Sequence, residues 1–152
     1  MSRPVPRGLD PRRLAWVLLP IALALPACGG DEETTVDVTL QEFAIIPSSA
    51  SVDAGSVTFE ATNEGPDDDH ELVVIRTDLE ASALPTNEDG SVNEDGEGIE
   101  VIGEIEEFPP GETESATFDL EAGSYVLICN IYDEDEQEAH YAEGMRVEFS
   151  VA

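Results

Sequence analysis

The sequence contains no lysine: among its 152 residues, six arginines face 35 Asp and Glu residues, giving a formal net charge of −29. A surface this negative repels nucleic-acid phosphates and anionic lipid headgroups, so neither is expected as a partner. Cysteine, histidine and methionine are also scarce, with two of each. The positions of these few side chains are therefore informative.

The first 27 residues have the composition of an export leader. Four arginines lie within the first 13 residues, and an apolar stretch follows from Leu14 to Leu25. That stretch is too short to span a bilayer as a helix. It ends in Leu25-Pro26-Ala27-Cys28, which resembles a bacterial lipobox, where the cysteine is lipidated and becomes the first residue of the mature protein.

The leader predicts the organisation of the whole chain. We expect residues 1–27 to form a lipoprotein-type signal peptide, residues 28–35 to form an acidic tether that starts at the lipidated Cys28, and residues 36–152 to form one domain. The protein would then be exported and anchored to the cell membrane, facing the periplasm or the cell exterior. An ordinary secretory cleavage site is the alternative, and the Arg12-Arg13 pair leaves the export route open.

Without the leader, the charge becomes more extreme. Arg76 and Arg146 are then the only basic residues besides histidine, against 34 acids, a formal charge of −32. An acidic coat adapted to salt would explain this charge, and so would an acidic docking face. We favour the coat, which would keep an exported protein soluble.

The apolar pattern predicts strands. Residues alternate between apolar and polar over 36–40, 57–61 and 145–151, and a continuous apolar run covers Leu72–Ile75. Short strands of this kind at regular spacing, separated by turn-forming residues and without a helical period, predict an all-β fold. We expect a Greek-key antiparallel β-sandwich of about seven to eight strands.

Residues 78–107 are the least informative part of the domain. Asn, Asp, Glu and Gly recur there, which predicts an acidic surface loop. A small calcium site is the alternative, although the spacing does not match an EF-hand loop. Ile99–Ile105 would return to the core as a short strand or a helical turn.

Four side chains of the expected domain form a candidate metal set. Cys129, His140 and Met145 lie within 17 residues of one another, and His70 starts the apolar run upstream. Two imidazoles, one thiolate and a weak thioether are the ligands of a mononuclear blue-copper site. The alternative is a copper-free sandwich in which Cys129 and Met145 only fill the core.

The domain resembles the cupredoxins, the plastocyanin- and azurin-like blue type 1 copper proteins. The residues that carry the resemblance are Phe43, Pro47, Val57-Thr58-Phe59, Asn63-Glu64-Gly65, His70, Pro110-Gly111-Glu112, Gly123-Ser124-Tyr125, Cys129-Asn130, His140-Tyr141 and Gly144-Met145. The resemblance implies one copper ion, with His70, Cys129 and His140 as ligands and Met145 as the axial ligand. Ten residues separate Cys129 from His140, whereas plastocyanin-like loops have only a few.

The resemblance also implies a function. We expect one-electron transfer by a membrane-anchored monomer, with a redox partner protein such as a cytochrome or a terminal oxidase. Copper delivery, storage or resistance without electron transfer is the alternative. An enzyme is not expected, because copper oxidases and nitrite reductases of this fold need further histidines for additional copper centres, and none remain.

Overall fold

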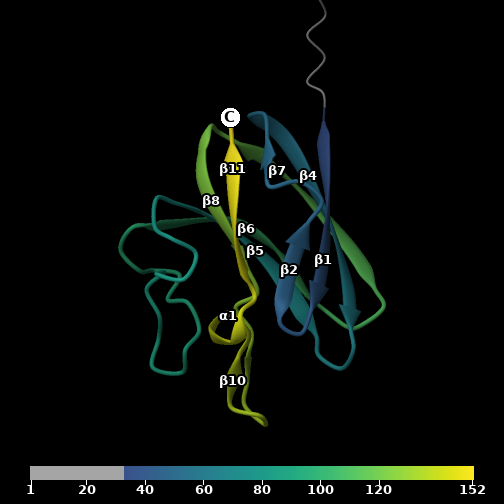
Figure 1. The fold of residues 1–152 in the computed structure, drawn as a ribbon, viewed down its shortest axis with the longest axis vertical. Coiled ribbons are helices and arrows are strands. Elements are labelled where there is room, and N and C mark those ends of the chain that lie inside the picture. Colours follow the sequence, from purple (N-terminus) through teal and green to yellow (C-terminus); the bar gives the residue numbers. More distant parts are fainter. Residues whose placement is uncertain (1–32) are drawn as a thin grey trace, which may run out of the picture.

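The computed structural model describes residues 33–152 and shows a sandwich of two β-sheets (Figure 1). One sheet has the order β2-β1-β4-β7 and the other the order β3-β11-β8-β5-β6. A two-stranded ribbon and one short helix lie outside the sheets. The elements are β1 (Thr34–Gln41), β2 (Ala44–Pro47), β3 (Ser51–Val52), β4 (Gly55–Gly65), β5 (His70–Thr77), β6 (Ile99–Phe108), β7 (Thr113–Leu120), β8 (Gly123–Ile128), β9 (Tyr132–Asp133), β10 (Glu138–Ala139), α1 (His140–Glu143) and β11 (Arg146–Val151).

The predicted signal peptide, Cys28 and most of the tether lie outside the described residues. Within residues 33–152, no helix is long and apolar enough to cross a membrane.

The predicted all-β sandwich is confirmed, with more strand segments than expected and with mixed sheets. β1 pairs with β4 in parallel, and β3 pairs with β11 in parallel, whereas the other pairs are antiparallel. The parallel β1–β4 pair arises because the chain reverses through β2, joins the second sheet as β3, and returns beside β1. The apolar stretch that begins at Val36 is a hairpin of β1 and β2, with Glu42 and Phe43 in its turn.

The inner faces of the two sheets form the main core. Val57, Phe59 and Ala61 alternate inward along β4, each with no exposed surface. The Phe59 ring meets the Phe149 ring of β11 edge to face at a centroid distance of 5.5 Å, and this contact joins the two sheets. Because every second side chain of these strands points inward, the two sheets together form one continuous apolar layer between them.

A second apolar cluster covers the outer face of β5. Val73 and Ile75 point away from the main core, yet both are fully buried. The segment from residue 78 to residue 98 covers them with Leu84 and Val92, which are 5% and 2% exposed. The predicted acidic loop therefore also has a packing role, because the continuous apolar run of β5 needs apolar cover on both faces. Ile99–Phe108 is a strand, not a helical turn.

Candidate metal centre

The topology places the four candidate ligands at one end of the sandwich. His70 is the first residue of β5, and Cys129 directly follows β8. These strands are neighbours, with Val73 opposite Ile128, so His70 and Cys129 lie at the same end of the sheet. His140 begins α1, and Met145 connects α1 to β11 (Figure 1).

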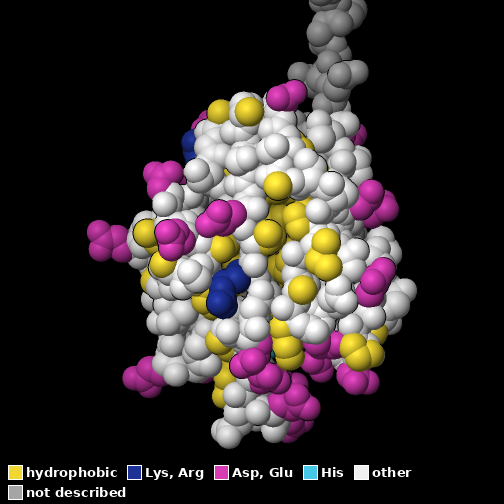
Figure 2. All heavy atoms as spheres, viewed as in Figure 1, with side chains coloured by type: hydrophobic (Ala, Val, Ile, Leu, Met, Phe, Trp, Pro, Cys, Tyr) yellow, Lys and Arg dark blue, Asp and Glu magenta, His cyan; other side chains and the backbone are white. Residues whose placement is uncertain are grey.

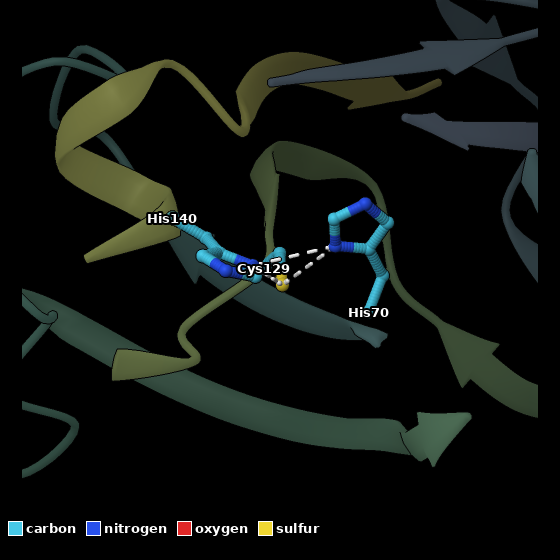
Figure 3. Close-up of side chains that lie close together, drawn as sticks. All are labelled: His70, Cys129 and His140. Carbon is cyan, nitrogen blue, oxygen red and sulfur yellow. Dashed lines mark hydrogen bonds between the residues drawn. The ribbon is translucent and has the colours of Figure 1, made fainter. Parts of the chain in front are cut away.

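Three donor atoms converge (Figure 3). The Nδ1 atoms of His70 and His140 are 3.3 Å apart, and the Cys129 Sγ atom lies 3.4 Å from His140 Nδ1 and 4.0 Å from His70 Nδ1. The three side chains are at most 2% exposed. Among residues 33–152 this is the one group of three or more His, Cys, Asp or Glu side chains close enough to hold a metal ion.

Backbone hydrogen bonds connect Met145 to both His140 and Cys129. Its N–H donates to the His140 carbonyl oxygen at 3.0 Å, and its own carbonyl oxygen accepts from the Cys129 N–H at 3.1 Å. The Met145 side chain has no exposed surface and packs in the same apolar cluster as Cys129. Its role as axial ligand stays a prediction that this placement favours.

The ten residues between Cys129 and His140 form a hairpin of their own. β9 and β10 pair through Asp133 opposite Glu138 and Ala139 opposite Tyr132. The His140 N–H donates to the Ile131 carbonyl oxygen at 3.0 Å, so the base of the hairpin is closed. The additional length therefore projects from the sandwich, and His140 is held by regular hydrogen bonds rather than by an open loop.

Gly144 permits the tight connection between α1 and Met145. Its φ of +137° lies in a region that L side chains rarely adopt, and a Cβ there would stand 3.0 Å from the Phe43 carbonyl oxygen. Phe43 itself packs its ring edge to face on the His140 ring, at a centroid distance of 5.3 Å. The β1–β2 turn therefore closes over the His140 side of the centre.

Burial sets the protonation of the donors in the metal-free protein. It raises the pKa of the Cys129 thiol to about 12. It also lowers the pKa of His70 and of His140, and the proximity of His140 lowers that of His70 further. At neutral pH the centre thus consists of a thiol and two neutral imidazoles. A metal that displaces the thiol proton gains a soft sulfur and two nitrogens, the set that fits copper in both oxidation states.

Glu71 and Asn130, which directly follow the candidate ligands His70 and Cys129, are bonded to each other. The sequence pattern did not predict this contact. Glu71 accepts the Asn130 N–H on its Oε1 at 2.9 Å. Burial raises the pKa of Glu71 to about 7. The signal available in the sequence was the position of each polar residue directly after a candidate ligand.

No protein-family model and no curated protein sequence matches this chain. Solved structures do match. The reduced auracyanin of Roseiflexus castenholzii is 23% identical with a TM-score of 0.56, over 78% of this chain and 97% of that chain. Auracyanin B is 22% identical with a TM-score of 0.56, over 81% and 91%. Auracyanin A of Chloroflexus aurantiacus, described as a "blue" copper protein, is 21% identical with a TM-score of 0.55, over 79% and 99%. These likenesses show that the chain has the cupredoxin fold, as its sequence predicted.

Proposed function

We propose that this protein is a type 1 copper protein that carries single electrons. His70, Cys129 and His140 would hold one copper ion through Nδ1, Sγ and Nδ1, with the Met145 thioether as a weak axial ligand. The observation that carries the proposal is the convergence of the two histidines of the chain on Cys129, the one cysteine among the described residues, in a buried centre at the end of a cupredoxin-fold sandwich.

The protein residues would make electron transfer fast. Copper, when bound, supplies the one-electron couple. The mixed sulfur and nitrogen donors suit both oxidation states, and the surrounding sandwich fixes their positions, so few atoms need to move when the charge changes. Burial of all three donors excludes water, which would otherwise add ligands and reorganise.

Burial also argues for electron transfer over copper delivery, storage or resistance. Delivery requires a partner's ligands to reach the metal, yet the candidate donor side chains are at most 2% exposed. The chain outside its predicted leader also has a single methionine, Met145, and two histidines, so few additional donors exist for metal exchange. Electrons can cross a few ångströms of protein without such contact.

The charge around the centre supports a partner with a cationic face. A groove of about 490 Å³ beside His140 is lined by the acidic residues Asp67, Asp68, Asp69, Glu107, Asp133, Glu134 and Asp135. Acidic side chains gather at the end of the molecule where α1 and β10 lie (Figure 2). A cytochrome or terminal oxidase with a basic docking surface would be attracted to this end, and the attraction would weaken with salt.

We further propose that the protein acts outside the cytoplasm as a monomer attached to the membrane through lipid on Cys28. The lipobox-like sequence supports the anchor. The first strand begins at Thr34, so residues 29–33 would separate the lipid from the sandwich.

The test is a titration of the purified leaderless protein with Cu(II), followed by visible absorption. We expect an intense thiolate-to-copper band that saturates at one copper per chain. The Cys129→Ser variant should remain folded and lack this band, because a serine oxygen is too hard and too weakly acidic to replace the thiolate. A pale wild-type complex would favour the delivery alternative, and a full band in the serine variant would refute the ligand assignment.

A further inference from the structure

Two buried side-chain polar atoms among the described residues have no hydrogen-bond partner: Oε2 of Glu42 and Nε2 of His70. They belong to side chains that face each other, since Glu42 Oε1 lies 3.9 Å from His70 Nε2. Leaving one buried donor or acceptor unpaired costs about 1–3 kcal/mol. The two side chains are therefore neighbours, and each has unused hydrogen-bonding capacity.

The Glu42 carboxylate is held in place by the chain that leads to His70. Its Oε1 accepts the backbone N–H groups of Asp67 and Asp68, at 3.0 and 2.7 Å. The side chain is only 12% exposed. Because Oε1 is occupied by these two donors, Oε2 is the oxygen with free acceptor capacity.

The orientation of the His70 ring determines which hydrogen-bond donor faces Glu42 Oε2. The Nδ1 atom of His70 faces Cys129 and His140, so Nε2 lies on the opposite side of the ring (Figure 3). When Nδ1 binds a metal, the neutral imidazole must carry its proton on Nε2. That N–H is then a fixed donor with no exposed surface, beside a carboxylate.

We propose that metal binding closes a hydrogen bond from His70 Nε2–H to the Glu42 carboxylate, which makes Glu42 a positioning residue of the copper centre. This inference rests on the proposed copper function. The carboxylate oxygen 3.9 Å from Nε2 is Oε1, about 1 Å beyond hydrogen-bond length, so the carboxylate must turn to present Oε2 to the ring. A carboxylate on the far nitrogen fixes the tautomer and the ring orientation and strengthens the imidazole as a donor. Its negative charge also favours Cu(II) over Cu(I), so it lowers the reduction potential.

A purely structural role for Glu42, holding the loop at Asp67 and Asp68, makes a different prediction. The Glu42→Gln variant separates the two roles. Its amide oxygen can still accept both backbone N–H groups, whereas its NH2 group would oppose His70 Nε2–H, donor against donor. The matched control is Asp69→Asn, because exposed Asp69 acts on His70 by charge alone.

The experiment compares wild type, Glu42→Gln and Asp69→Asn by Cu(II) competition with a chelator, by redox titration, and by proton NMR of the Cu(I) form. We expect Glu42→Gln to lose about 10- to 100-fold in Cu(II) affinity. Its reduction potential should rise further than that of Asp69→Asn. In wild type, the His70 Nε2 proton should give a downfield, slowly exchanging resonance, which should be lost in Glu42→Gln.

Two results would overturn the proposal about Glu42 while leaving the copper function intact. One is a Glu42→Gln variant whose affinity and potential match those of Asp69→Asn. The other is a His70 Nε2 proton that exchanges freely in copper-loaded wild type, a measurement that needs no variant to fold. A wild-type protein that shows no thiolate-to-copper band would instead refute the proposed function, and the role of Glu42 with it.

Discussion

Removal of the Asn130 side chain should weaken the attachment of the segment 78–98 to the strand end that carries Cys129. Asn130 Oδ1 accepts the Val92 N–H at 2.5 Å, and Nδ2 donates to the Val92 carbonyl oxygen at 3.1 Å and to Glu94 Oε1 at 3.0 Å. The first two bonds fix a residue that is only 2% exposed, whereas Glu94 is exposed and contributes little. The Asn130 side chain therefore links the second apolar cluster to the metal centre.

The cost of Asn130→Ala follows from these bonds. The Val92 N–H left buried without a partner costs about 1–3 kcal/mol, and the lost hydrogen bond to the Val92 carbonyl oxygen costs about 0.5–1.5 kcal/mol. We expect the free energy of unfolding to fall by about 1.5–4.5 kcal/mol, and Tm to fall by roughly 5–20 °C for a domain of this size. Urea titration and thermal melts of the metal-free protein measure both quantities.

Asn93→Ala is the matched control, because Asn93 is exposed and its side chain accepts only the Asp95 N–H within its own turn. It should cost no more than about 0.5 kcal/mol. If Asn130→Ala destabilises the protein no more than Asn93→Ala does, the segment is not held by Asn130 and the reasoning fails.

Three further outcomes are expected. Met145→Leu should keep copper and colour but raise the reduction potential in a redox titration, because loss of the weak sulfur donor disfavours Cu(II); an unchanged potential would exclude an axial role. The Tm of the metal-free protein should rise between 0.01 and 1 M NaCl, because the screening length shrinks from about 30 to about 3 Å and relieves self-repulsion; a flat Tm would favour a docking surface over a salt-adapted coat. Glu71→Gln should stabilise the metal-free protein at pH 8 but not at pH 4. The folded-state pKa of Glu71 is about 7 and its ordinary value 4.5, so wild type loses stability as the pH rises through that window, which urea titrations at several pH values would detect.

The sequence by itself determined the strands and the candidate ligands. Alternation such as Val57, Phe59 and Ala61 is a local property, because successive side chains of a strand point to opposite faces whatever the rest of the chain does. The candidate ligands could be named because histidine and cysteine are so scarce that their placement carried information. The cupredoxin resemblance, which those residues carried, predicted the fold correctly.

Only the tertiary structure decided which distant residues meet at the centre. Glu42 lies 28 positions before His70, and nothing in its local pattern distinguishes it from the other acids. Its carboxylate lies 3.9 Å from His70 Nε2 because the β1–β2 turn, which carries Glu42, packs against the start of β5. The burial of Val92 under Asn130 likewise depends on how a long loop folds back over the outer face of a sheet. Such contacts join residues that are far apart in the sequence. A periodic apolar pattern predicts which face of a strand is buried, but not which residues cover that face.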